Sequence, residues 1–195
     1  MAEPYLANVK FLVVEDNKFM QTVIRRVLNS LGTKEVRECT DGADALKVLK
    51  TFPADIVITD WAMEPLDGIE LTRMIRTASD SNNPYVPIIM LTAYSEMIRI
   101  VEARDAGVNE FVVKPISVNT LFSRIQAVIE KPRTFIRIKN FFGPDRRRKD
   151  MPFNEPDRRK GRTTLPDNLG SDGPDLDQDE INTLMNPGKG EGEAS

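Results

Sequence analysis

The feature that most constrains the fold is the run IVITD at residues 56–60, in which four β-prone residues end in an acid. A short apolar run of this kind is typical of a strand that is buried on both faces of a parallel sheet. Ligands of open α/β sheets lie outside the carboxyl ends of the strands, so this run places Asp60 where chemistry occurs. Taken alone, Asp60 is equally well explained by a turn or a helix cap.

Three further apolar runs end in polar residues in the same way. They are residues 9–14 before Glu15 and Asp16, residues 86–91 before Thr92, and residues 110–113 before Lys114. Carboxylates gathered at one edge repel one another, and a hard cation with oxygen ligands, such as Mg²⁺, removes that repulsion. A lysine and a hydroxyl beside them suit a bound anion. The pattern predicts a site where a metal ion, a carboxylate and a phosphoryl group meet.

Helical patterns separate the predicted strands. A short strand at residues 36–39 completes the set, and apolar residues recur with helical period after each strand. Five strands that alternate with helices predict a doubly wound, five-stranded parallel sheet. Right-handed crossovers then bring the polar strand ends to one rim of the sheet.

These residues resemble the signature of receiver domains of two-component response regulators, and the single-domain CheY-like chemotaxis regulators are the most similar in appearance. The resemblance rests on Glu15 and Asp16, Asp60, Thr92 and Ala93, and Lys114 and Pro115. It covers residues 6–131 and implies a flavodoxin-like, CheY-like fold. It also implies a response regulator that switches interactions between proteins, in chemotaxis or motility.

The resemblance implies a role for each residue of the site. Asp60 would accept the phosphoryl group, while Thr92 and Lys114 would contact its oxygens, with a cis peptide bond before Pro115. Phe111 would act with Thr92 as an aromatic switch that turns inward. The expected ligands of Mg²⁺ are Glu15, Asp16, Asp60 and the backbone carbonyl of Ala62.

The chain contains no histidine, which excludes His-based triads and a self-supplied phosphohistidine. The phosphoryl group must therefore come from another molecule, either a histidine kinase or a phosphotransfer protein. Self-phosphorylation and dephosphorylation of Asp60 are the only catalytic events expected, so we do not expect an enzyme that turns over an independent substrate. The single cysteine, the lack of a signal-peptide pattern and the lack of a long apolar run favour a cytoplasmic protein without a membrane span.

Residues 132–195 form a basic and then acidic tail, which we predict to be mostly disordered because no apolar period sustains a second core. A Pro-Asp-Arg-Arg motif occurs twice in it and resembles the arginine-rich tails of CheY-like proteins that bind cyclic di-GMP. The alternatives are a solvated basic linker and general attraction to anions. No helix-turn-helix pattern indicates sequence-specific DNA binding. The candidate dinucleotide ligands are Asp145, Arg146, Arg147, Arg148, Asp157, Arg158 and Arg159.

The acidic end of the tail contains a predicted short helix at residues 178–186. Ile181, Leu184 and Met185 fall on one helical face. This stretch resembles the N-terminal peptide of the flagellar switch protein that phosphorylated chemotaxis regulators bind, which makes such a component a candidate downstream partner. We therefore expect autoinhibition or self-association through this end, whereas the alternative is an accidental amphipathic patch.

Overall fold

The computed structural model describes residues 4–93, 97–138, 141–145 and 177–185; within these ranges, the side chains of residues 97, 98 and 182–185 are not described. The strands are β1 Lys10–Val14, β2 Glu35–Cys39, β3 Ile56–Asp60, β4 Ile88–Thr92, β5 Glu110–Val113, β6 Phe135–Ile138 and β7 Phe141–Pro144. The helices are α1 Lys18–Ser30, α2 Gly42–Leu49, α3 Gly68–Thr77, α4 Met97–Ala106, α5 Val118–Glu130 and α6 Gln178–Met185.

The first five strands form one parallel sheet in the order β2-β1-β3-β4-β5. This is the flavodoxin-like order, and it confirms the predicted fold class. The order changes direction between β1 and β3, which are neighbours in register from Phe11 opposite Ile56 to Val14 opposite Thr59. Ligands of such sheets bind at this switch point, outside the carboxyl ends of the strands.

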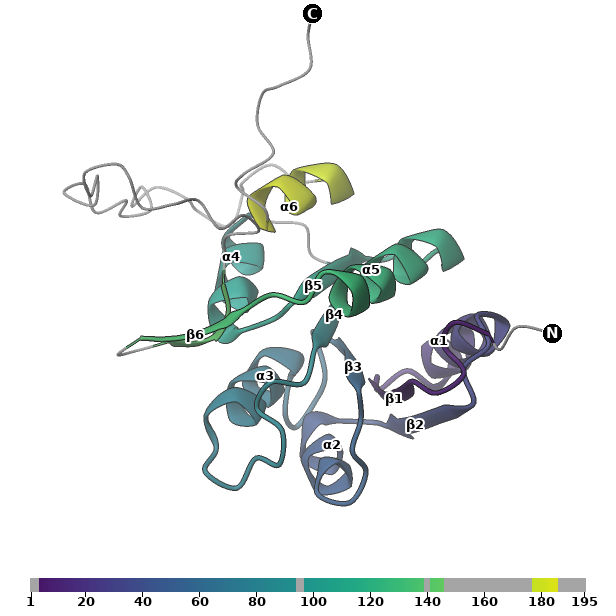
Figure 1. Ribbon diagram of the computed structural model, residues 1–195, viewed down its shortest axis with the longest axis horizontal. Helices are drawn as coiled ribbons and strands as arrows, with labels where there is room; N and C mark the ends of the chain where they lie inside the picture. The colour runs from purple at the N-terminus through teal and green to yellow at the C-terminus, as the bar shows by residue number, and fades with distance from the viewer. Residues whose placement is uncertain (1–3, 94–96, 139–140, 146–176, 186–195) are drawn as a thin grey trace, which may run out of the picture.

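Helices cover both faces of the sheet (Figure 1), and successive residues of each strand face opposite layers. In β1, Phe11 and Val13 pack with α1 and α5, whereas Leu12 and Val14 pack with α2 and α3. All five residues of β3 and of β4 are buried, as the uninterrupted apolar runs predicted. A third apolar cluster lies between the sheet and α4, and it contains Phe111 of β5.

The tail contributes structure that the sequence analysis did not predict. β6 and β7 pair as an antiparallel hairpin, which contacts α3 and α4. Phe135 and Phe142 of the hairpin pack edge-on against Tyr85, with ring centroids 5.2 Å from it in each pair. The buried guanidinium of Arg76 also lies over the ring of Phe135, with 5.0 Å between the Cζ atom of Arg76 and the ring centroid. The hairpin therefore extends the packed body beyond α5.

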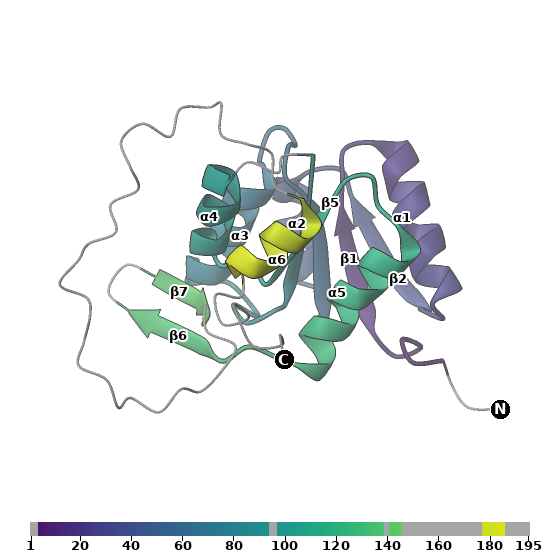
Figure 2. The same cartoon turned by 90° about the horizontal axis from the view of Figure 1, so that it is seen from above.

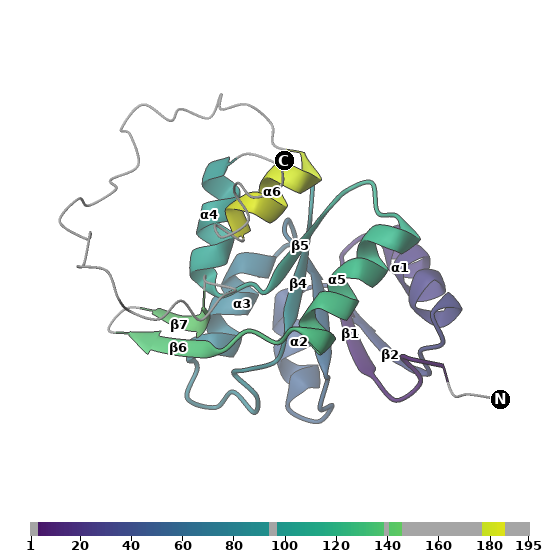
Figure 3. The ribbon, with the colours of Figure 1, turned by 45° about the horizontal axis from the view of Figure 1, so that its top comes forward.

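The last described element is α6, at Gln178–Met185, where the sequence analysis placed a helix over residues 178–186. It lies beside α4 and over β5 (Figures 2 and 3). No helix in the described ranges is long and apolar enough to cross a membrane.

Candidate functional site

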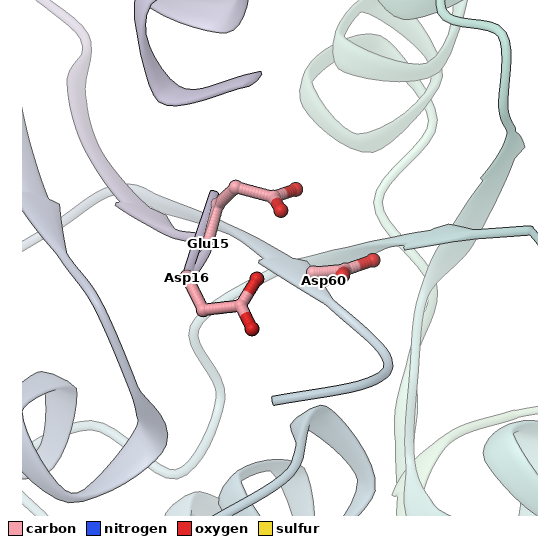
Figure 4. A group of neighbouring side chains, drawn as sticks. All are labelled: Glu15, Asp16 and Asp60. Carbon is pink, nitrogen blue, oxygen red and sulfur yellow. The ribbon is translucent and has the colours of Figure 1, made fainter. Parts of the chain in front are cut away.

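Three carboxylates meet at the switch point of the sheet. Glu15 and Asp16 follow β1, and Asp60 is the last residue of β3. One oxygen from each of the three carboxylates lies within 4.8 Å of the others (Figure 4). Glu15 and Asp60 are 1% and 7% exposed, whereas Asp16 is exposed. The cluster thus opens to solvent on the side of Asp16.

Asn17 directly follows the two acids after β1 and caps the start of α1. The side chain of Asn17 accepts hydrogen bonds from the backbone N–H groups of Phe19 and Met20. The side-chain amide of Gln21 donates to the carbonyl of Glu15 at 2.7 Å and to that of Cys39 at 2.9 Å. Gln21 therefore holds the backbone beside the acids, a positioning role that no sequence signal indicated.

Lys114 reaches the acids from the end of β5. Its Nζ lies 2.9 Å from Oδ1 of Asp60 and 3.1 Å from Oε2 of Glu15. The peptide bond between Lys114 and Pro115 is cis, as the resemblance implied. Burial alone would lower the pKa of Lys114. Asp60 and Glu15 outweigh this effect through their hydrogen bonds with Lys114 and their negative charges, so the pKa of Lys114 lies above its ordinary value. The ammonium group is therefore held charged between two carboxylates.

Burial, followed by the charge of Asp60, raises the pKa of Glu15 above its ordinary value, although Lys114 acts in the opposite direction. A further cation would relieve this crowding of negative charge. The donors available are oxygen atoms of carboxylates, which are the ligands that Mg²⁺ prefers. The residues present therefore fit a magnesium ion held by Glu15, Asp16 and Asp60.

The remaining predicted receiver residues are Ala62, Thr92 and Phe111. Ala62 lines a shallow hollow together with Asp16 and the buried Trp61. Thr92, at the end of β4, is buried, and its carbonyl accepts a hydrogen bond from the backbone N–H of Lys114 at 2.8 Å. Phe111 is 1% exposed and lies in the apolar cluster beneath α4. The structure thus places all the predicted receiver residues on neighbouring strand ends or, for Phe111, within β5.

Two of the predicted tail residues, Asp145 and Ile181, are described, and they lie away from the acidic cluster. The backbone N–H of Asp145 donates to the carbonyl of Thr134 at 2.7 Å, which places Asp145 at the base of the hairpin rather than at the acidic cluster. Ile181 is fully buried against α4 and β5. The candidate arginines and the second aspartate lie outside the described residues, as do the side chains of two members of the apolar face of α6. These are Arg146, Arg147, Arg148, Asp157, Arg158, Arg159, Leu184 and Met185.

Comparison with known proteins supplies a family. The model of the response regulator receiver domain matches residues 11–126, more than half of the chain. Chemotaxis protein CheY-3 of Vibrio cholerae serotype O1 is 36% identical over 124 residues, which cover 64% of this chain and 94% of that protein. Chemotaxis protein CheY of Pseudomonas aeruginosa is 36% identical over 123 residues, which cover 63% of this chain and 98% of that protein.

Solved structures agree with these sequence matches. Chemotaxis protein CheY4 of Vibrio cholerae superposes with a TM-score of 0.57 at 28% identity, covering 62% of this chain and 98% of the other. The receiver domain of the Francisella response regulator 1452 superposes with a TM-score of 0.58 at 28% identity, covering 65% and 100%. The hairpin and α6 lie beyond residue 126, where the match to the family model ends.

Proposed function

The chain belongs to the response regulator receiver domain family, and from this premise we propose that it accepts a phosphoryl group on Asp60 and thereby switches its interactions with another protein. The observation that carries the proposal is the position of Lys114, whose ammonium lies 2.9 Å from the Asp60 carboxylate inside a cluster of acids. The Asp60 carboxylate thus supplies a nucleophilic oxygen, and the Lys114 ammonium supplies a positive charge for the incoming phosphoryl group.

In the proposed reaction a carboxylate oxygen of Asp60 attacks phosphorus, and the bond from phosphorus to the donor breaks. Catalysis of such transfers is mainly positioning and neutralisation of charge. Lys114 would release its ion pair with Asp60 and pair with a phosphoryl oxygen, and the Thr92 hydroxyl would donate to another. Mg²⁺ bound by Glu15, Asp16, Asp60 and the carbonyl of Ala62 would supply positive charge for the phosphoryl oxygens.

The donor would be a partner histidine kinase or a phosphotransfer protein, because the chain has no histidine of its own. The relatives named above are chemotaxis proteins, and this supports a role in chemotaxis or motility with a flagellar switch component as the downstream partner. We propose that the response regulator acts in the cytoplasm. We propose no turnover of an independent substrate, only transfer to Asp60 and its later hydrolysis.

Acetyl phosphate with Mg²⁺ tests this proposal, with intact-mass spectrometry as the readout. The wild-type protein is expected to gain one phosphoryl adduct, which the Asp60→Asn variant does not gain. Asp55→Asn is the matched control, because Asp55 precedes the opposite end of β3 and accepts a hydrogen bond from the backbone of Lys10 at 2.8 Å. An adduct of equal yield in Asp60→Asn, or none in the wild type, would refute the proposal.

A second candidate function rests on the repeated Pro-Asp-Arg-Arg motif of the tail, whose arginine forks suit guanine edges and phosphates. On this hypothesis the protein is an adaptor that responds to cyclic di-GMP. Calorimetry would then record binding by the full chain and its loss in Arg146→Ala and Arg158→Ala. Equal heats in all three proteins would count against the motif as a cyclic di-GMP site and leave the solvated linker and general attraction to anions as the alternatives.

A further inference from the structure

The C-terminal helix α6 packs against the face formed by α4 and β5 (Figures 2 and 3). Ile181 is 0% exposed and belongs to the same apolar cluster as Ile100 of α4 and Phe111 of β5. An isoleucine side chain this deeply buried stabilises its contact by burying apolar surface. The helix is therefore a docked element and not a solvated end.

A second contact fixes the register of α6 on β5. Among the described residues β5 is the edge strand of the sheet, so its outer edge carries backbone groups that no described strand binds. The side-chain Oε1 of Gln178 accepts a hydrogen bond from the Val113 N–H at 2.9 Å, and its Nε2 donates to the Phe111 carbonyl at 3.4 Å. One side-chain amide thus takes the place of the peptide group that a sixth parallel strand would offer.

The docking helix also specifies its own start. The side chain of Asp177 accepts hydrogen bonds from the backbone N–H groups of Asp179 and Glu180, both at 2.8 Å. The Glu180 carboxylate accepts in return from the Asp177 N–H at 2.9 Å. This reciprocal arrangement is a capping box, which stabilises a first helical turn locally. Gln178 and Ile181, three residues apart, then lie on the face that meets β5 and α4.

The part of β5 that binds α6 is adjacent in sequence to Lys114 of the proposed phosphorylation site. Val113, which donates to Gln178, directly precedes Lys114, whose Nζ contacts Asp60 at 2.9 Å. Val113 is also paired in register with Thr92. A backbone shift that accompanies movement of Lys114 or Thr92 toward a phosphoryl group would therefore reach the N–H of Val113, to which Gln178 of α6 binds.

We propose that residues 177–185 are a tethered ligand of the α4–β5 face, which excludes other helical peptides from that face and whose affinity changes when Asp60 is phosphorylated. The competing partner would be a short helix with an acidic cap, followed by glutamine and, three residues later, an apolar side chain. The exclusion stands on the contacts of α6 alone. Its control by phosphorylation rests on the proposed function.

Competition can be measured by the fluorescence anisotropy of a labelled synthetic peptide of residues 175–187 added to the full chain. A tethered segment has an effective concentration on the order of 0.1–1 mM, and where the dissociation constant of the segment is about a tenth of that value, its release should tighten binding of the free peptide by about tenfold. The variants Ile181→Asp and Gln178→Ala, made in the full chain, are expected to show this gain. Asp179→Asn, at an exposed residue of the same helix, is expected to bind as the wild type does.

Beryllofluoride with Mg²⁺, a phosphoryl mimic, tests the coupling. Fluorescence of Trp61, the only tryptophan and the neighbour of Asp60, reports whether the site is loaded. The expected result is a Trp61 response together with a changed affinity for the labelled peptide in the wild type, and neither in Asp60→Asn. A Trp61 response with unchanged affinity would overturn the coupling but not the proposed function, whereas no Trp61 response would overturn both.

Two results would overturn the exclusion. One is equal affinity of the labelled peptide for the wild type and for both release variants. The other is a wild-type dimer in sedimentation velocity that becomes a monomer in Ile181→Asp, because α6 of a second copy of the chain would then occupy the α4–β5 face.

Discussion

Replacement of Arg76 by methionine tests whether one buried cation joins α3, the sheet and the hairpin. Arg76 is 2% exposed. Its guanidinium donates to the carbonyls of Pro84 and Val86, each at 2.8 Å, to the carbonyl of Gly107 at 3.0 Å, and to Oδ1 of Asn109 at 3.0 Å. Burial lowers its pKa to about 9, so the side chain still carries its charge at neutral pH.

The cost follows from the acceptors that methionine would leave behind. The Val86 and Gly107 hydrogen bonds are buried, and a buried acceptor without a donor costs about 1–3 kcal/mol. The hydrogen bond to Pro84 is only partly buried, so water can replace it there. Removal of a buried charge returns part of this loss, because the guanidinium no longer has to be desolvated. We expect a net destabilisation of about 2–4 kcal/mol.

Urea unfolding with linear extrapolation measures this change. Arg73→Met is the matched control, because Arg73 lies on the same helix and makes an exposed ion pair with Glu102 at 3.1 Å. Exposed pairs contribute less than about 1 kcal/mol, so this control should unfold close to the wild type. Equal free energies of unfolding for the two variants would refute the reasoning.

The other predictions concern the site and its surroundings. In Gly68→Ala the new Cβ would lie 2.2 Å from the carbonyl oxygen of Asp60, so the backbone beside Asp60 must shift. Phosphorylation by acetyl phosphate should therefore slow by at least about tenfold, and an unchanged rate would contradict this prediction. A Mg²⁺ titration followed by Trp61 fluorescence should require about tenfold more metal in Asp16→Asn, and coincident curves would count against Asp16 as a ligand. Burial raises the pKa of Cys39 to about 11, so a thiol reagent at mildly alkaline pH should modify the native protein about 100-fold more slowly than the urea-unfolded chain, whereas similar rates would show an accessible thiolate.

The central sheet and its acidic rim were predictable because their signals are local. Apolar runs with abrupt polar ends specify both a buried strand and the place where it stops, and the run at residues 56–60 became β3 with Asp60 as its last residue. The arrangement of the rim then follows from the handedness of the crossovers. The distances of Lys114 to its two carboxylates were not predictable, because they depend on side-chain conformations.

The hairpin escaped prediction for a physical reason. β7 contains Gly143 and Pro144, residues that ordinarily mark the end of a strand. A Cβ at Gly143 would lie 3.0 Å from the Cα of Gly107, so the glycine allows two backbones to approach closely. This contact involves a residue far away in the sequence, and no local pattern reports it. Gln178 and Gln21 were missed for the same reason, since each acts through distant backbone groups.

The hairpin also determines where the chain can be truncated without loss of packing. A fragment that stops at residue 131, where the resemblance to receiver domains ends, would strip Phe135 and Phe142 from Tyr85 and uncover one side of the buried Arg76. Recombinant work on the isolated receiver should therefore retain the chain through Asp145, which closes the base of the hairpin on Thr134.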